Sequence, residues 1–181
     1  MLGETLFVGI GTGLDIAHFP HGPAITAIDI SSDMLDRAQP RRRRYLEGTP
    51  HEGRAVLRLE LQDAAALPYA DAHFDTVATA CTLCSVPDAD VVLRQILRVL
   101  RPGGRLLLFE HVRSAHPLLG AVLDVMSLWS RRSGTDMSRD TLASVIAAGF
   151  VIERVEASFL DIILAVEASR PEVQSDEVIS Q

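Results

Sequence analysis

Three closely spaced glycines near the start of the chain constrain its fold most strongly. A short apolar run leads directly into Gly9, Gly11 and Gly13. Such a loop lets the backbone turn tightly and approach a ligand without a Cβ in the way. Asp29 ends the next apolar run, where a carboxylate can accept hydrogen bonds from ribose hydroxyls. The pattern predicts two strands of an α/β sheet with a nucleoside site at their ends.

The spacing of the glycines bears on which nucleoside would bind. A dinucleotide fingerprint places its last glycine at the sixth position counted from Gly9, where close packing leaves space for a pyrophosphate. That position is Leu14 here, and the third glycine is Gly13. A nicotinamide-dependent oxidoreductase is therefore the less favoured interpretation, and a length that fits a single domain also argues against it.

Strand and helix patterns alternate along the rest of the chain. The strands are expected near residues 5–9, 24–29, 54–61, 74–79, 104–110, 150–157 and 159–168. The last two lie so close together that only an antiparallel hairpin can join them. The expected fold is α/β and Rossmann-like, a doubly wound, mostly parallel seven-stranded sheet with a C-terminal antiparallel hairpin.

Helices are expected between the strands. Residues 31–38 should form one, with Ser31 or Ser32 as the N-cap and Pro40 stopping it. Two further helices are expected over residues 88–100 and 138–148.

Residues 117–131 carry apolar side chains on more than one face of any helix they form. A buried core helix is the plainer interpretation. The alternatives are the wall of an apolar substrate pocket, a dimer surface or an element that touches a membrane. Ligands of open α/β sheets bind beyond the carboxyl ends of the strands, and the segment begins there, which favours the pocket. Met126 and Trp129 would then lie near substrate or partner.

Further motifs occur in the order of a known family. Asp63 and Ala64 follow the third strand, and a Pro-Gly-Gly turn at 102–104 precedes the fifth. With the glycine loop, they resemble the class I S-adenosylmethionine (SAM) methyltransferases, in the group of the ubiquinone/menaquinone C-methyltransferases. Residues 81–88 and 109–112 are most similar to the methyltransferase-like thiol methyltransferases and their bacterial relatives. The resemblance covers roughly residues 5 to 168.

The resemblance implies SAM as the cofactor and S-adenosylhomocysteine as its product. The glycines would hold the methionine part and Asp29 the ribose. Ile30 and Met34 would pack on adenine, whose edge Asp63 and Ala64 would contact. The implied cofactor residues are Gly9, Gly11, Thr12, Gly13, Asp29, Ile30, Met34, Asp63, Ala64 and Ala80.

The chemistry of a sulfonium methyl group limits what the protein must supply. The methyl group is already activated, so the site mainly aligns the acceptor and excludes water. A thiol, an amine, a quinol-type carbon or a lipid head group could then accept the methyl group, and the acceptor is expected to be small and apolar. A hydroxyl would need a base. His111 is the best candidate, because it follows the fifth strand beside Glu110; a structural histidine is the slightly favoured alternative.

Two departures from the family pattern open other interpretations. Phe7 stands where the family usually has an acidic residue. The helices that usually precede the first strand, or a membrane anchor, are expected to be absent, so a partner subunit could cover the site in a homodimer, or the chain could be a fragment. A catalytically silent SAM-fold protein that binds a partner is the alternative function.

Composition fits one domain over residues 1–168, followed by a disordered tail over 169–181. The net charge of −7 makes nucleic acid an unlikely partner, since phosphate binding needs clustered basic residues. The basic run 41–44 is interpreted as a solvated surface segment. No run of eighteen apolar residues occurs, so the chain is expected to be cytoplasmic, with peripheral membrane contact left open.

Cys81 and Cys84 are the only cysteines of the chain. A structural zinc site needs four ligands and no second pair is present. We therefore expect no bound metal and no required disulfide, with both residues lining the cofactor cleft.

Overall fold

The computed structural model of the chain describes residues 1, 3–48, 56–111, 141–158 and 163–172. Within them, a 7-stranded sheet has the order β3-β2-β1-β4-β5-β7-β6. The strands are β1 (Glu4–Val8), β2 (Ala24–Asp29), β3 (Val56–Leu61), β4 (Phe74–Ala80), β5 (Leu100–His111), β6 (Val151–Ser158) and β7 (Ile163–Ser169). The helices are α1 (Ser32–Glu47), α2 (Ala89–Val99) and α4 (Thr141–Ala147), with the short 3-10 helices η1 (Leu14–His18) and η2 (Ala64–Ala66).

The strand pairing confirms the expected fold class. Strands β1 to β5 pair in parallel, whereas β7 pairs antiparallel with both β5 and β6. The strand order reverses between β1 and β4, and ligands of open α/β sheets bind at such a reversal.

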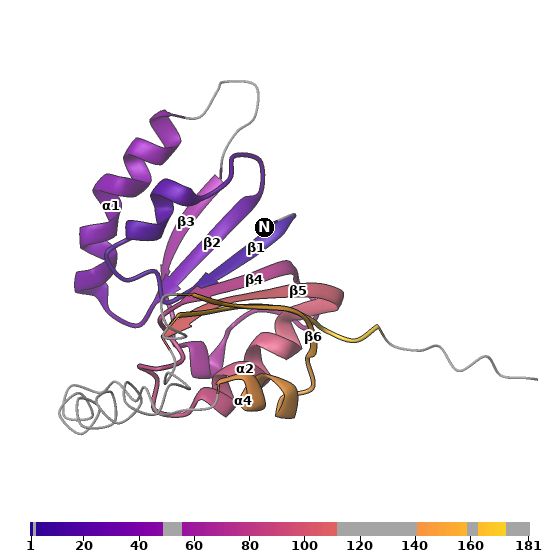
Figure 1. Ribbon diagram of the computed structural model, residues 1–181. Coiled ribbons are helices and arrows are strands. Elements are labelled where there is room, and N and C mark those ends of the chain that lie inside the picture. The colour runs from indigo at the N-terminus through magenta and orange to yellow at the C-terminus, as the bar shows by residue number, and fades with distance from the viewer. Residues whose placement is uncertain (2, 49–55, 112–140, 159–162, 173–181) are drawn as a thin grey trace, which may run out of the picture.

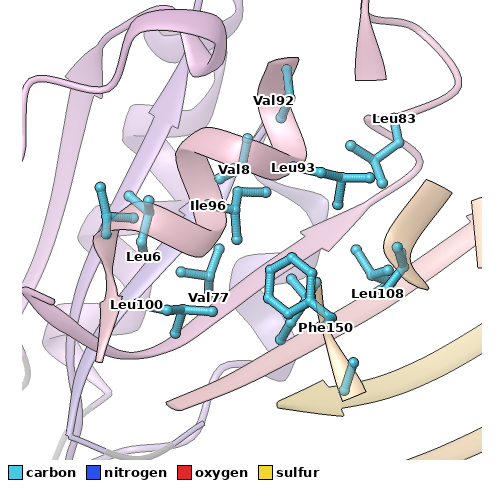
Figure 2. Close-up of a cluster of buried hydrophobic side chains, with 14 of the residues drawn as sticks. Leu6, Val8, Val77, Leu83, Val92, Leu93, Ile96, Leu100, Leu108 and Phe150 are labelled. Carbon is cyan, nitrogen blue, oxygen red and sulfur yellow. The ribbon is translucent and has the colours of Figure 1, made fainter. Parts of the chain in front are cut away.

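The helices cover both faces of the sheet (Figure 1). On one face, α1 and η1 pack over β1, β2 and β3, around a cluster that includes Phe7, Ile25 and Leu57. On the other face, α2 and α4 cover the larger cluster. Figure 2 shows this second cluster, where Leu93 and Ile96 of α2 lie among side chains from the strands. Each such fully buried side chain stabilises the fold by roughly 1.5–3 kcal/mol.

Helix α1 is longer than expected, and the prediction that Pro40 stops it is wrong. Ser31 is the N-cap, and its hydroxyl accepts a hydrogen bond from the Met34 N–H. Pro40 lies inside the helix, which continues to Glu47. The residues beyond the proline gain tertiary contacts, because Tyr45 is buried and its hydroxyl donates to the Pro20 carbonyl at 2.8 Å. Such packing can outweigh the roughly 3 kcal/mol that an interior proline costs.

The boundary between α2 and β5 also differs from the expectation. Asp88 caps α2, accepting hydrogen bonds from the Asp90 and Val91 N–H groups at 3.0 and 3.1 Å. Strand β5 then begins at once with Leu100 instead of near residue 104. The pairing of β4 with β5 shifts register between Phe74 and Thr76, and this irregularity accommodates the Pro-Gly-Gly turn within the strand.

The end of the described chain is well anchored. Strand β7 runs to Ser169, and the Arg170 guanidinium donates to the carbonyls of Leu97 and Arg98. Residues 173–181 of the expected tail and the whole apolar segment 117–131 lie outside the described residues, as does Ser138, the expected start of the helix over 138–148. Among the helices that the structure does describe, none has the length and apolar character needed to cross a membrane.

Candidate functional site

A cavity of about 550 Å³ lies where β1, β2 and β4 end. Gly9 and Gly11 border it after β1, Asp29 at the end of β2, and Cys81 and Thr82 after β4. Its volume falls within the roughly 300–1,000 Å³ typical of small-molecule sites. The location matches the strand-order reversal, so the topology places a ligand site here.

The glycine loop forms one wall of the cavity. The N–H groups of Gly9 and Ile10 both donate to the Ile28 carbonyl, at 2.9 and 3.0 Å, which fixes the loop against β2. Gly9 and Gly11 have φ of 75° and 54°, a left-handed conformation that favours glycine. A Cβ added at Gly11 would meet no atom within 4 Å. The Gly11 backbone therefore borders open space, as close approach to a ligand requires.

Asp29 connects the glycine loop to β2. Its Oδ2 accepts a hydrogen bond from the Gly11 N–H at 2.8 Å, and its Oδ1 accepts one from the Ser31 N–H at 3.0 Å. A carboxylate has about four lone-pair sites, so both oxygens can still accept from ligand hydroxyls. Asp29 thus shapes the loop and offers acceptors to the cavity.

The next part of the cavity wall is apolar with one acidic edge. The side chains of Ile30 and Met34 border the cavity although they are 73% and 38% exposed. At the other edge, Asp63 caps η2, its Oδ1 accepting from the Ala65 N–H at 2.8 Å. Its second oxygen is not used in this cap. Apolar side chains beside a hydrogen-bond acceptor suit a flat heterocycle with an exocyclic amino group.

The segment 81–88 between β4 and α2 forms the opposite wall, and we call it the β4–α2 loop. Cys81, Thr82, Ser85 and Val86 are among its cavity-lining residues. The Thr82 hydroxyl donates to the Val8 carbonyl at 3.1 Å, so the loop lies directly against the end of β1. The prediction that both cysteines line the cofactor cleft is confirmed for Cys81 and wrong for Cys84, which is buried and is not part of the cavity lining. The rest of this wall could not be predicted, because a loop without periodicity carries no signal of what it faces.

Glu110 holds this loop from beneath. It is 1% exposed, and its Oε1 accepts hydrogen bonds from the N–H groups of Thr82 and Leu83, both at 3.0 Å. Burial raises the pKa of Glu110, which the two N–H groups partly offset. Burial and the adjacent Glu110 charge raise the pKa of the Cys84 thiol to about 12. A raised pKa favours the neutral thiol form of Cys84 over the thiolate.

Comparison with known proteins identifies the family behind this geometry. Residues 6–108 match the model of the methyltransferase domain family. The chain belongs to that family. It is 32% identical over 155 residues to a phosphatidylethanolamine N-methyltransferase of Cereibacter sphaeroides. This match covers 86% of this chain and 68% of that protein. It is 34% identical over 122 residues to a ubiquinone/menaquinone biosynthesis C-methyltransferase of Shewanella woodyi, covering 65% of this chain.

This methyltransferase domain spans only 46% of the Shewanella woodyi protein. A SAM-dependent methyltransferase from Methanosarcina mazei has a similar fold, with a TM-score of 0.75 at 20% identity over 94% of this chain and 93% of that one. The predicted class, SAM-dependent methyltransferases with relatives among the ubiquinone/menaquinone C-methyltransferases, is thereby confirmed.

SAM is the cofactor of this class, and the residues of the cavity fit it. The open space at Gly11 can receive a backbone-close ligand. Asp29 offers carboxylate oxygens for the two ribose hydroxyls, and Ile30 and Met34 offer an apolar surface for adenine. Asp63 and Ala64 border the same cavity, where Asp63 offers a hydrogen-bond acceptor.

Three of the predicted cofactor residues do not line this cavity. Gly13 faces the helix, since an added Cβ would lie 3.0 Å from the Ala38 Cβ, so its role is close packing. Thr12 lies between the glycines, where its carbonyl accepts from Arg41 at 2.9 Å. The basic run 41–44, expected as a solvated segment, thus lies inside α1, and Arg41 tethers the glycine loop.

Ala80, the third, lines a second cavity, of about 610 Å³, over β4, β5 and β7 on the sheet face that carries α1. Phe7, at the position that is acidic in the family, lines the same cavity. Leu107, Phe109 and Ala165 are among its other apolar residues. His111, the candidate base, ends β5, and its side chain lies outside the described part of the chain.

Proposed function

We propose that this domain transfers the methyl group of SAM to a small lipophilic acceptor through a sulfur, nitrogen or carbon nucleophile. The observation that carries the cofactor half is the Asp29 carboxylate, bonded to Gly11 and lining a cavity of suitable size. The lipophilic acceptor is supported by the names of two relatives. One name specifies methylation of a phospholipid, and the other specifies a C-methylation in ubiquinone and menaquinone biosynthesis.

Bound SAM would supply a methyl group activated by a positively charged sulfur, and S-adenosylhomocysteine, whose sulfur is neutral, would be the leaving group when the methyl carbon bonds to the acceptor. The domain's own residues orient the reactants and enclose them. Asp29 and the glycine loop fix the nucleoside, while the β4–α2 loop shields the opposite side from water. Alignment of the reacting atoms and exclusion of water are sufficient for a thiol or an amine.

The acceptor loses a proton when its nucleophile is a neutral thiol, amine or hydroxyl. His111 is proposed as the group that receives this proton where the acceptor needs a base. Its backbone, paired with Ile163, is at the carboxyl end of β5, the edge of the sheet where the cavity opens. A thiol or amine would be methylated with little dependence on His111.

The second cavity supports a lipophilic acceptor. Ala80 lines that cavity, and the next residue, Cys81, lines the cofactor cavity, so the two cavities approach each other at the end of β4. Phe7 and Phe109 add aromatic surface there. An apolar acceptor seated over β4 and β5 would reach toward the cofactor from this side. For a phospholipid, this arrangement requires contact with a membrane surface.

A panel of acceptors tests the proposal. The protein is incubated with SAM labelled in its methyl group and with short alkyl thiols, a demethylquinol, phosphatidylethanolamine vesicles or amines. We expect label in at least one lipophilic acceptor. Asp29→Ala should reduce the rate at least tenfold at low SAM concentration, and the exposed Asp33→Ala, on the first turn of α1, serves as the matched control. Tight SAM binding without transfer to any acceptor would favour the catalytically silent alternative.

A further inference from the structure

Glu110 is a buried acid whose hydrogen bonds all go to the β4–α2 loop. It lies near the end of β5, on the sheet face covered by α2, in line with the apolar residues Leu106 and Leu108. Among the ion pairs of the described residues, none involves Glu110. A buried carboxylate without a cation is costly and needs other compensation. Here the compensation comes from backbone N–H groups.

We propose that Glu110 is a positioning residue, which holds the β4–α2 loop in the conformation that forms one wall of the cofactor cavity. The proposal rests on the function proposed above for that cavity. Glu110 would act on the cofactor only through the loop, because it does not line the cavity itself.

The contact between Glu110 and the loop is specific. One oxygen, Oε1, accepts from two consecutive N–H groups, those of Thr82 and Leu83. This arrangement needs a side chain of the length of glutamate, with an acceptor at its tip. Leu83 is 2% exposed, and its side chain points into the α2 core, as Figure 2 shows. The turn is thus held by its backbone at Glu110 and by an apolar side chain in the core.

The turn at Thr82 and Leu83, which Glu110 holds, is in direct contact with the start of the glycine loop. The Thr82 hydroxyl donates to the carbonyls of Val8 and Ala80, both at 3.1 Å. The same hydroxyl lies where a Cβ on Gly9 would be, at 2.1 Å from that ideal position. A shift of Thr82 would therefore move the wall that touches Gly9. Displacement of the turn changes the cavity without any change in the residues that bind SAM.

The turn also contains a conformation that isolated residues avoid. Cys81 has φ of 51°, in the left-handed region, although it is not glycine. The Cys81 N–H donates to the Phe109 carbonyl at 2.7 Å, next to Glu110 in the chain. Such backbone strain persists only where surrounding contacts impose it. Without the Glu110 contacts, the segment would lose one of the interactions that hold it in this state.

Because the second oxygen of Glu110 has no hydrogen-bond partner in the described part of the chain, the variant Glu110→Gln can test the contacts that the first oxygen makes with the loop. Within the described residues, Glu110 Oε2 and Thr79 Oγ1 are the buried side-chain oxygens that lack a hydrogen-bond partner. Both side chains are on the α2 face of neighbouring strands. In Glu110→Gln, the amide oxygen can keep both loop bonds while the NH₂ group replaces Oε2. In Glu110→Asp, the charge is kept but the carboxylate is one methylene too short to reach the turn.

The experiment separates the length of the side chain at position 110 from its charge. SAM affinity is measured by calorimetry for the wild type, Glu110→Gln and Glu110→Asp, and hydrogen exchange is followed at the Thr82 and Leu83 amides without SAM. Leu106→Val, on the same strand and face but away from the cavity, is the control for a general loss of packing. We expect affinity within threefold of wild type for Gln and the control, and at least tenfold weaker for Asp. The two amides should stay protected in Gln and exchange rapidly in Asp.

Two results would overturn the proposal. One is an aspartate variant with affinity within threefold of wild type and with both amides still protected. The other is a folded glutamine variant in which those amides exchange freely, and this outcome is decisive even if the aspartate variant does not fold. A wild type that does not bind SAM would refute the proposed function instead, while amide exchange would still test whether Glu110 holds the turn.

Discussion

Asp29 and Glu110 are both acidic, but their different surroundings give them different roles. Asp29 is partly exposed at the cavity and can take further hydrogen bonds, whereas Glu110 is buried and bonds only to the loop behind the cavity. The role of Asp29 could be predicted from sequence, since its place at the end of the second strand follows from local patterning. The role of Glu110 could not, because its partners Thr82 and Leu83 are 28 and 27 residues away in the chain.

The buried charge of Glu110 predicts a pH dependence of stability. Its pKa is raised in the folded state from the ordinary value of 4.5, chiefly by burial, with Cys84 as the neighbouring titratable group. The folded protein therefore holds this proton more tightly than the unfolded chain, and the free energy of unfolding falls as pH rises above about 4.5. Glu110→Gln removes this term. Its melting temperature relative to wild type should be higher at pH 8 than at pH 5, and an equal difference at both values would contradict the raised pKa.

The two cysteines are predicted to be neither metal ligands nor a required disulfide. Two thiols cannot by themselves complete a tetrahedral zinc site, and no group of three or more possible metal-binding side chains occurs among the described residues. The double variant Cys81→Ser/Cys84→Ser should fold and bind SAM within a few-fold of wild type, as measured by melting and calorimetry. Stoichiometric zinc in the purified wild type that disappears in the double variant would refute this prediction.

At the scale of elements, the predicted ends of the helices over 88–100 and 138–148 lie within one residue of the ends of α2 and α4, whereas α1 continues from its predicted end at residue 38 to Glu47. Of the two serines predicted as N-cap of α1, Ser31 is the one that caps the helix, and such a cap can be predicted because it depends only on the following few residues. The end of α1 was missed, since it depends on Tyr45 packing against Phe19 and His21, more than twenty residues earlier. The Pro-Gly-Gly sequence predicts a turn before the fifth strand, whereas β5 begins at Leu100 and includes these residues.

Pro40 should make α1 less stable than it could be. Proline has no N–H to donate to the carbonyl four residues earlier, and its ring crowds that carbonyl. Pro40→Ala is therefore expected to stabilise the protein by about 1–3 kcal/mol. Part of this gain is offset, because alanine gives the unfolded chain more conformational entropy than proline does. Denaturant unfolding measures this change, with the exposed Arg43→Ala as a control expected within about 0.5 kcal/mol. A destabilised Pro40→Ala would show that the proline fits its site better than the helix geometry indicates.

At the scale of the whole molecule, the topology was the most predictable feature and the cavity wall the least. The parallel sheet with its antiparallel hairpin follows from alternating elements and from the short connection before the last strand. The site then follows from the strand-order reversal between β1 and β4. The β4–α2 loop was only partly foreseen, because its contacts join β1, β5 and α2. The expected roles of Met126 and Trp129 lie outside the described residues and stay predictions.

The central claim, that this cavity binds SAM through Asp29, is tested most directly by calorimetric titration of SAM into the wild type, Asp29→Ala and Asp33→Ala. Loss of charge-assisted hydrogen bonds, each worth about 1.5–3 kcal/mol, predicts at least roughly tenfold weaker binding by Asp29→Ala. Asp33→Ala, whose side chain is exposed outside the cavity, should bind as the wild type does. Equal affinity of all three proteins, or no binding by the wild type, would contradict the account.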